Sequence, residues 1–318
     1  MIQLEPVHSF PIEEYLLTRM AFSPDGAAIA VGHKHFRAYS AESGEPRAEY
    51  PFTEFLARIC YSPDGRFVAG ANVADNHPAT RGKLTVFAAG NGREVFSAAA
   101  EQPIEALAFA SGGAIYWNAQ TMLAGARIEP HTELPSVALR DLQLRGLACS
   151  STGFTCFGRE AAGSVQMVEG ADLIFRKFRL RSLDPQGAPK NDIDLGIGAG
   201  VHALSPDGKL LAVEMVDFKN NERHVSLIDV ETGVEANLLP LEANTLPVFE
   251  FGLGSEYFLC MKEDAEDNFN RLRIWRTSDL KLVGEAQVDL AFHSLACRLE
   301  HSLVAFLGGG KLGVFALS

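Results

Sequence analysis

Three copies of one five-residue turn constrain the fold of this chain more than any other feature. FSPDG at 22–26 returns as YSPDG at 61–65 and as LSPDG at 204–208. Proline presets φ near about −65°, aspartate can accept a hydrogen bond from the backbone ahead of it, and glycine adopts the positive φ that closes the turn. The motif therefore predicts tight turns made by Pro24, Asp25, Gly26, Pro63, Asp64, Gly65, Pro206, Asp207 and Gly208.

Weaker copies of the same turn occur between and after the clear ones. They are LAFASGG at 107–113, LACSSTG at 147–153, FEFGLGS at 249–255 and LACRLEHS at 295–302. The turn positions are then 23, 62, 110, 150, 205, 252 and 298, at intervals of 39 to 55 residues. Repeats of about 40 to 50 residues are typical of four-stranded propeller blades. The spacing predicts seven such units across the 318 residues.

Each unit has the same internal order of apolar runs and turns. The fifth unit shows it best, with VHAL, the turn SPDG, KLLAVEMV, the interval DFKNNER, HVSLIDV, the turn ETG and VEANLLPL. Short runs rich in β-branched and aromatic residues, bounded by turn residues, predict strands. Four antiparallel strands in each of seven units predict an all-β, seven-bladed propeller.

On these turns, and on the strand endings LRIWRTSDLKLVGEA at 272–286 and SLIDVETGVEA at 226–236, the chain resembles WD-repeat β-propellers over essentially its full length. Trp275 is followed by Arg276 where the family has Trp-Asp, Ile228-Asp229 keeps the aspartate, and the family's Gly-His dipeptide is absent. The blades are therefore expected to be held together mainly by apolar packing between neighbouring sheets.

The two ends of the chain predict how the ring closes. The seventh unit is one strand short, whereas residues 2–10 resemble a strand that has no blade of its own. We expect that segment to be the outer strand of the last blade, which removes unpaired strand edges. The chain is then one domain, 1–318, with blades at 13–52, 53–100, 101–140, 141–183, 200–242, 243–290 and 291–318 plus 1–12.

Charge and composition limit the classes of partner. The net charge is −12, from 28 basic and 40 acidic residues, so nucleic acid is not an expected partner. The N-terminal segment lacks a signal-peptide pattern, and no apolar run reaches about 18 residues, so we expect a cytoplasmic protein that does not insert into membranes. The five cysteines occur singly within strand-like runs and are expected to be buried thiols, without disulfides or a zinc site.

The connections between strands point to one face of the ring as functional. Turns after the first and third strands share one face, which carries the Ser-Pro-Asp-Gly turns, and the remaining connections lie on the other. The long intervals 72–82, 128–143, 183–200, 217–223 and 262–271 all fall on that other face. Long loops carry function more often than scaffold strands. The predicted partner-binding residues are Asp75, Asn76, His77, Arg81, Lys219, Arg223, Glu263, Asp264, Asp267 and Arg271.

Several short motifs suggest chemistry, but each also has a structural explanation. His33 and His35 could begin a metal site or belong to a polar loop, and EDAEDN at 263–268 lacks the residue order of a calcium loop. GIGAGV at 196–201 is interpreted as a flexible connector between blades rather than a phosphate loop. FRKFRLRSL at 175–183 is either a basic stripe for an acidic partner or a solvated outer strand. The residues expected in the core include Met122, Phe154, Phe175 and Phe178.

No nucleophilic or metal-binding constellation is evident, so the first hypothesis is a non-catalytic scaffold without cofactors or metals. As the resemblance to WD-repeat proteins implies, it would bind protein partners, either as a monomeric ring or as a subunit of a larger complex. The alternative is a propeller enzyme, similar to lactonases, hydrolases or quinone-dependent dehydrogenases, with a site at the axial mouth of the same face. That alternative predicts several His, Asp or Glu side chains converging on the axis.

Overall fold

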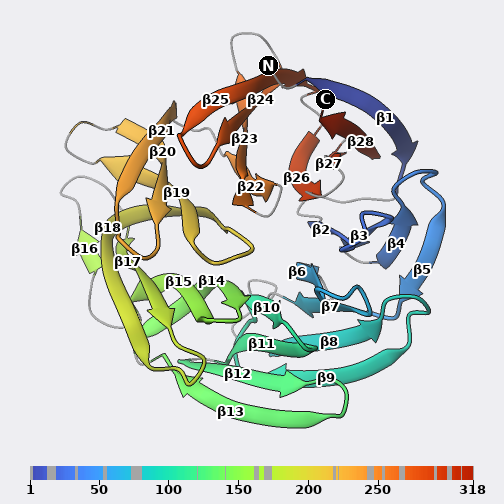
Figure 1. Cartoon of the computed structure of the whole chain (residues 1–318), viewed down its shortest axis with the longest axis horizontal. Coiled ribbons are helices and arrows are strands. Elements are labelled where there is room, and N and C mark those ends of the chain that lie inside the picture. Colours follow the sequence, from blue (N-terminus) through green and yellow to red (C-terminus); the bar gives the residue numbers. More distant parts are fainter. Residues whose placement is uncertain are drawn as a thin grey trace.

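Seven antiparallel blades surround a central axis in the computed structural model of the chain (Figure 1). The described residues are 3–12, 19–32, 35–52, 56–72, 81–119, 121–139, 141–160, 165–167, 174–217, 220, 222–241, 247–252, 255–264, 269–289, 292–298, 303–308 and 310–317. Within each blade the strands follow one another from the axis outward. The predicted all-β propeller is confirmed.

The first four blades are built from consecutive strands. Blade 1 contains β2 (Arg19–Phe22), β3 (Ala28–Gly32), β4 (Phe36–Ser40) and β5 (Pro46–Tyr50). Blade 2 contains β6 (Leu56–Tyr61), β7 (Phe67–Asn72), β8 (Gly82–Ala88) and β9 (Glu94–Ala100). Blade 3 contains β10 (Leu107–Ala110), β11 (Ala114–Ala119), β12 (Met122–Arg127) and β13 (Thr132–Ala138). Blade 4 contains β14 (Leu142–Ser150), β15 (Gly153–Glu160), β17 (Ile174–Leu183) and the first half of β18 (Pro189–Leu204), and β16 (Val165–Met167) pairs with β17.

The remaining blades complete the ring. Blade 5 contains the second half of β18, β19 (Leu210–Asp217), β20 (Glu222–Asp229) and β21 (Glu235–Leu241). Blade 6 contains β22 (Val248–Gly252), β23 (Tyr257–Asp264), β24 (Phe269–Arg276) and β25 (Lys281–Val288). Blade 7 contains β26 (Phe292–Arg298), β27 (Leu303–Gly308), β28 (Lys311–Leu317) and β1 (Leu4–Pro11).

The boundary predicted between the fourth and fifth blades is wrong. Residues 189–197 pair with β17 as the outer strand of blade 4, so that blade does not end at 183. The same strand continues past Gly198 and pairs with β19 as the inner strand of blade 5. GIGAGV at 196–201 thus links the two blades as predicted, but as part of one continuous strand rather than as a flexible loop.

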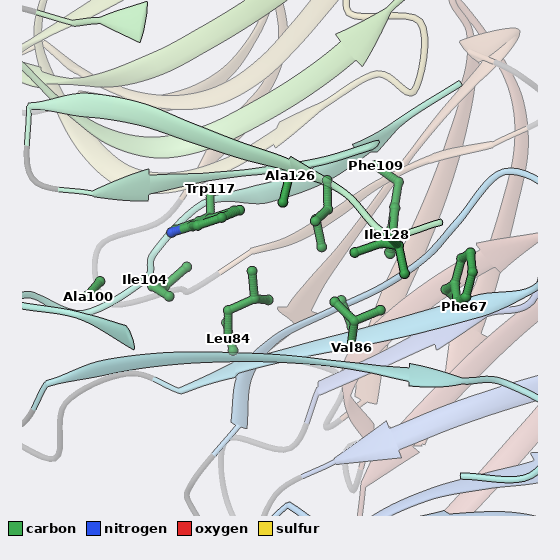
Figure 2. Packing of buried hydrophobic residues seen from close by; sticks show 12 residues of the cluster. Phe67, Leu84, Val86, Ala100, Ile104, Phe109, Trp117, Ala126 and Ile128 are labelled. Carbon is green, nitrogen blue, oxygen red and sulfur yellow. The ribbon is translucent and has the colours of Figure 1, made fainter. Parts of the chain in front are cut away.

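Apolar contacts between neighbouring blades form the core. Seven clusters of buried hydrophobic side chains are present in the described part of the chain, and each joins two adjacent blades. Figure 2 shows the cluster in which Leu84 and Val86 of blade 2 face Trp117 and Ala126 of blade 3. The expectation that the blades are held mainly by apolar packing is therefore confirmed.

The Ser-Pro-Asp-Gly turns share one hydrogen-bonding pattern. Ser23 Oγ donates to Asp25 Oδ1 at 2.6 Å and accepts the Ala28 N–H at 2.9 Å. The same two bonds recur around Ser62 at 2.6 and 2.9 Å and around Ser205 at 2.7 and 2.9 Å. Gly65 has φ of +71°, as the turn chemistry predicts. The serine hydroxyl therefore connects the turn aspartate to the backbone at the start of the second strand and stabilises the turn.

The first strand closes the ring. β1 pairs antiparallel with β28, from Leu4 opposite Leu317 to Pro11 opposite Lys311, and the two termini lie close together in Figure 1. Phe10 packs against Tyr39 of blade 1, with ring centroids 5.9 Å apart. The predicted closure by the N-terminal segment is confirmed.

Candidate functional site

Half of the predicted partner-binding residues lie outside the described residues. These are Asp75, Asn76, His77, Lys219 and Asp267. Glu263 and Asp264 belong to the end of β23 rather than to a loop, and their side chains are not described. Arg81 is exposed immediately before β8, and its carbonyl accepts a bond from Asn72 Nδ2 at 3.3 Å.

The other two predicted arginines are engaged within their own blades. Arg223 forms an ion pair with Glu214 of β19, and its Nε donates to Glu214 Oε1 at 2.7 Å. Arg271 Nη1 lies 2.5 Å from Glu285 Oε1 of β25. The described arginines of the predicted set therefore do not converge on a single site.

Four of the five long intervals are shorter than predicted, because strands occupy much of them. β13 lies within 128–143 and the start of β18 within 183–200. The connections 128–131 and 184–188 therefore join third to fourth strands and lie on the face of the Ser-Pro-Asp-Gly turns, so the predicted face is wrong for them. Strands also extend to 217 and 264 and begin again at 222 and 269. Outer strands of a propeller are largely exposed, so they lack the apolar alternation by which strands are recognised. The interval 73–80, within the predicted 72–82, lies outside the described residues.

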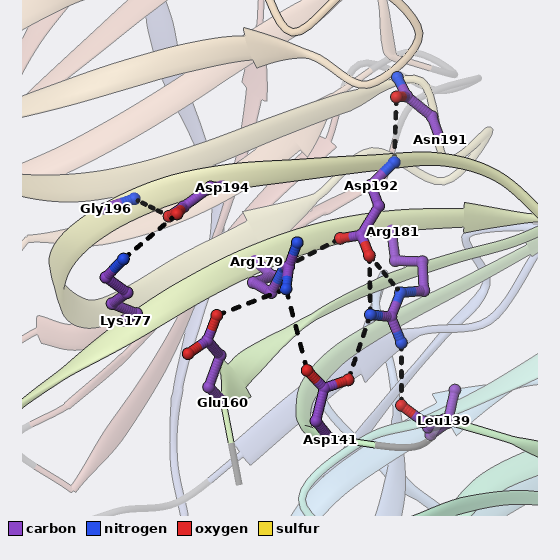
Figure 3. Close-up of polar contacts among 10 residues, drawn as sticks. All are labelled: Leu139, Asp141, Glu160, Lys177, Arg179, Arg181, Asn191, Asp192, Asp194 and Gly196. Carbon is purple, nitrogen blue, oxygen red and sulfur yellow. Dashed lines mark hydrogen bonds and ion pairs between the residues drawn. The ribbon is translucent and has the colours of Figure 1, made fainter. Parts of the chain in front are cut away.

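The basic stretch at 175–183 is the third strand of blade 4, and its described cations Lys177, Arg179 and Arg181 are paired within that blade, so neither predicted interpretation holds (Figure 3). Arg181 is buried; its Nη2 lies 2.8 Å from Asp192 Oδ2 and 3.3 Å from Asp141 Oδ1. Its Nη1 donates to the Leu139 carbonyl at 2.8 Å. Arg179 contacts Asp192 and Glu160 at 3.0 and 3.4 Å. The network ties the outer strand of blade 4 to the connection from blade 3.

A different group of charged side chains lies at the axial mouth. Arg58 Nε donates to the carbonyl of Glu105 at 2.7 Å, and Arg58 Nη2 donates to the carbonyl of Arg145 at 3.4 Å. Arg145 Nη1 lies 2.6 Å from Glu105 Oε2. His202 Nε2–H donates to the Arg145 carbonyl at 3.0 Å. The cluster thus joins the inner edges of blades 2, 3, 4 and 5.

The position of this cluster along the inner strands assigns it to one face. Arg19 is the first residue of β2 and Glu105 precedes β10, whereas Arg58 is the third of six residues in β6 and Arg145 the fourth of nine in β14. Each inner strand begins at the connection from the preceding blade. The mouth cluster, which we define as Arg19, Arg58, Glu105, Arg145 and His202, therefore begins at the face opposite the Ser-Pro-Asp-Gly turns, with Arg19 and Glu105, and extends along the inner strands into the ring.

Irregularities in strand pairing set the direction in which these side chains point. The register shifts between Leu56 and Arg58 in β6 and between Leu144 and Gly146 in β14, and it shifts again before His202 in β18. β-Bulges redirect side chains and are frequent beside functional sites. Gly146 leaves room for the imidazole, because a Cβ there would lie 2.9 Å from His202 Nε2.

Burial and mutual repulsion perturb the mouth cluster. The pKa of Arg58 is lowered to about 10, mainly by burial and then by Arg19 and Arg145, while the Glu105 carboxylate opposes these effects. Arg19 is exposed at the first position of β2, and partial desolvation beside the neighbouring strands lowers its pKa. A guanidinium with a pKa of about 10 is still charged at neutral pH, so the five residues bring together three positive charges and one negative charge.

A half-buried carboxyl group, Glu250, lies on the inner strand of blade 6. Burial raises the pKa of Glu250 from 4.5 to about 7, although the Phe251 N–H donates to its Oε1 at 3.2 Å. Cys297 on the neighbouring inner strand is near this carboxylate, and burial followed by Glu250 raises the pKa of its thiol. The cysteine stays neutral, so Glu250 is the group of this pair that titrates near neutral pH.

Stability is expected to fall as pH rises from about 4.5 to about 7, because the folded chain retains a proton on Glu250 that the unfolded chain releases. The full shift corresponds to roughly 3 kcal/mol, and partial contact of the side chain with solvent reduces the expected effect to about 2 kcal/mol. Glu250→Gln should therefore be about 2 kcal/mol more stable than the wild type at pH 8 and equal to it near pH 4. Urea unfolding at a series of pH values measures this difference, and a pH-independent difference would contradict it.

The other candidate groups give no reactive centre within the described residues. No set of three or more His, Cys, Asp or Glu side chains there is arranged to hold a metal ion. His33 lies outside those residues and His35 is exposed. The five cysteines are free thiols, and burial raises the pKa of Cys60, Cys149, Cys156 and Cys260. Phe154 and Phe178 are buried as predicted, whereas Met122 is 36% exposed at the start of β12, and the side chain of Phe175 is not described.

The tight-turn face is also hollowed between blades. A cleft of 660 Å³ lies between the Ser-Pro-Asp-Gly turns of blades 1 and 2, and it is lined by Asp25, Asp64 and Arg47 among others. Clefts of 580 and 510 Å³ flank Asp207 and Lys209 at the edges of blade 5.

In the described part of the chain, no helix combines the length and the apolar character needed to cross a membrane.

Sequence reasoning missed every member of the mouth cluster. The available signal was a charged residue four positions before the turn serine, in otherwise apolar inner runs, as in Arg19 before Ser23 and Arg58 before Ser62. Arg145, Glu105 and His202 are not at the same offset, because bulges shift their strands or because they precede them. Their convergence depends on the closed ring.

Comparison with known proteins supports the fold alone. No family model and no curated protein matches the chain. Among solved structures, hydrazine synthase of Kuenenia stuttgartiensis aligns with a TM-score of 0.70 at 13% identity, covering 93% of this chain and 94% of that one. The Cps50 (Swd1) β-propeller domain of Myceliophteria thermophila aligns at 0.64 and 12% identity over 99% and 100% of the two chains. A chain of the mitotic checkpoint complex aligns at 0.66 and 14% identity over 98% and 94%. At these identities the likeness establishes a seven-bladed propeller and not an activity.

Proposed function

We propose that this chain is a divergent WD-repeat-like scaffold that performs no catalysis and binds a protein partner across the face that bears the axial mouth. One observation carries the proposal: Arg19, Arg58 and Arg145 come from three different blades and converge with Glu105 at the mouth. A charged group at the centre of a rigid ring is suited to recognition, because the scaffold holds it in position without the cost of ordering a loop.

The surrounding features agree with binding rather than chemistry. The guanidinium of Arg58 is oriented by main-chain carbonyls of two other blades. Among the described residues beside it, no nucleophilic side chain is paired with a general base. One of the structural neighbours was solved as part of the mitotic checkpoint complex, which shows the same architecture in a protein assembly. A cytoplasmic monomeric ring, or one subunit of a larger complex, is the form that we propose for this chain.

Affinity capture from native extract tests this function. The bait is the whole chain as wild type, as a mouth variant with Arg19→Gln and Arg145→Gln, and as a control variant with Arg37→Gln. Arg37 forms an ion pair with Glu49 at 3.3 Å on the outer part of blade 1, away from the axis. We expect a protein that is retained by the wild type and by the control but reduced at least about tenfold by the mouth variant, a difference of about 1.4 kcal/mol in binding. Identical recovery with all three baits would contradict the proposal.

A further inference from the structure

We propose that the cleft between blades 4 and 5 on the tight-turn face is a docking site, and that its occupant is a short segment of a protein partner that carries one acidic and one basic side chain. The cleft has a volume of 580 Å³, within the range of about 300 to 1,000 Å³ that is common for ligand pockets. It lies on the face opposite the between-blade connections, so this inference goes beyond the proposed function and does not depend on it. A ring with a site on each face can hold two partners at once.

The walls of the cleft are joined by hydrogen bonds between the two blades. Thr155 Oγ1 of blade 4 donates to the Gly208 carbonyl of blade 5 at 2.6 Å. Asn191 Nδ2 of blade 4 donates to the carbonyls of Val230 and Glu231 of blade 5 at 3.1 and 2.7 Å. The cleft is therefore shaped before a ligand arrives, which lowers the entropy cost of binding.

The apolar side chains that line the cleft belong to the packed core. Phe154, Leu183 and Val230 are all buried, the first two in the cluster shared with blade 3 and the third in the cluster that joins blades 4 and 5. By contrast, the side chains of Lys190 and Glu231 are exposed. The groups that can recognise a charged ligand therefore lie at the rim.

Two of the four charged side chains that line the cleft already form a neutral pair. Lys209 Nζ lies 4.0 Å from Asp207 Oδ2 in the same turn. The Asp207 carboxylate also accepts hydrogen bonds from the hydroxyl groups of Ser205 and Ser255, at 2.7 and 3.0 Å. This pair needs no further ion, and it adds no net charge to the cleft.

The other two charged side chains are one cation and one anion, and neither has an ionic partner within the described residues. Lys190 Nζ donates to the Thr152 carbonyl at 2.7 Å, a neutral acceptor that orients the ammonium group without cancelling its charge. The Glu231 carboxylate pairs with no cation there. A segment with one acidic and one basic side chain complements both groups, whereas a purely acidic or purely basic segment would be repelled by one of them.

An exposed side chain beside the cleft favours a peptide segment over a small zwitterion. Val234 follows Glu231 in the turn between β20 and β21, and it is 66% exposed. A segment that fills the cleft can also cover this valine, whereas a molecule the size of one amino acid pairs with the two charges alone. The burial of apolar surface then adds to the two ion pairs.

The experiment measures binding of two labelled, amidated peptides to the whole chain by fluorescence anisotropy. Gly-Leu-Glu-Ser-Lys-Leu-Gly and Gly-Leu-Lys-Ser-Glu-Leu-Gly present the two charges in either order. We expect one of them to bind the wild type, with affinity falling as salt rises. Replacing its Lys or its Glu by Gln gives an acidic-only and a basic-only peptide, and each should bind about threefold to tenfold more weakly because one exposed ion pair is lost.

Variants of the two cleft residues separate the two ends of the peptide. Lys190→Gln should weaken the bipolar peptide about threefold to tenfold and leave the basic-only peptide unchanged, whereas Glu231→Gln should weaken the bipolar peptide and leave the acidic-only peptide unchanged. Residues that only stabilised the ring would affect all peptides alike. Lys281→Gln and Glu94→Gln are the matched controls, because both residues are exposed at the first position of an outer strand in another blade. They should leave every affinity unchanged.

Several outcomes would overturn the inference. These are the failure of both bipolar peptides to bind at millimolar concentration, equal losses in the cleft and control variants, or binding of free lysine or glutamate without binding of a peptide. A thermal melt checks that each variant is folded, and if Lys190→Gln does not fold, Glu231→Gln and the altered peptides still decide the matter.

The mouth variant with Arg19→Gln and Arg145→Gln keeps the two proposals separate. It should bind the bipolar peptide as the wild type does, because the cleft lies on the other face. Peptide binding with equal capture of partners by the wild type and the mouth variant would contradict only the proposed function. Loss of capture in the mouth variant, with no peptide binding to the wild type, would contradict only the inference about the cleft.

Discussion

Deleting residues 1–11 is expected to open the ring and to destabilise the whole protein by about 4 kcal/mol or more. The deletion removes β1, which pairs with β28 over its full length, and it removes the ring of Phe10 from Tyr39 of blade 1. It also leaves β28 as an unpaired edge on a ring whose other blades each have four strands. Because every blade packs on two neighbours, a gap at one interface weakens the cooperative unit rather than a single sheet.

Thermal unfolding and size-exclusion chromatography of the truncated chain measure this effect. A synthetic peptide of residues 3–11, added in excess, should restore part of the lost melting temperature by mass action. Val7→Ser serves as the control, since Val7 is 44% exposed on β1 and its replacement should change stability little. An unchanged melting temperature after the deletion would show that β1 does not close the ring.

Replacing Arg181 by alanine is expected to cost about 3 to 5 kcal/mol of folding free energy. Arg181 is only 7% exposed, and its guanidinium satisfies Asp192, Asp141 and the carbonyl of Leu139 at once. Its removal leaves partly buried carboxylates without their counter-ion and a buried carbonyl without its donor. The loss is much larger than for a solvent-exposed ion pair, whose contribution is about 0 to 1 kcal/mol.

Urea unfolding of Arg181→Ala is compared with that of Lys177→Ala on the same strand. Lys177 pairs with Asp194 at 3.5 Å, and both side chains are more than a third exposed, so that change should cost less than about 1 kcal/mol. Adding Asp192→Asn to Arg181→Ala should recover part of the loss, because the unpaired charge is then absent. Similar costs for the two single variants would contradict the role assigned to Arg181.

The features that could be predicted from the sequence are those with local causes. The turn at Gly65 follows from the side-chain chemistry of its own five residues, and it recurs at Gly26 and Gly208 with φ of 69° and 71°. The second strands β3 and β7 are buried along their whole length, so they stand out as continuous apolar runs. The number of blades followed from counting these turns and runs.

Outer strands and charged contacts could not be predicted in the same way. Residues 132–138 and 189–197 were taken for connections because exposed outer strands carry polar and apolar residues without a clear period. The stretch around Arg179 and Arg181 resembled a basic surface, because its partners Asp141 and Asp192 lie in other segments of the sequence. Charge along a sequence does not show which charges meet after folding.

The sequence by itself determined the turn type, the seven-unit repeat and the closure by the first strand, because each depends on the order of residues within a unit or at the chain ends. Only the tertiary structure decided which side chains meet at the axis. Arg19, Arg58 and Arg145 belong to different units and become neighbours because the ring brings their inner strands together, and bulges in β6 and β14 adjoin two of them. Local chemistry therefore specified the scaffold, whereas the geometry of ring closure specified the candidate binding site.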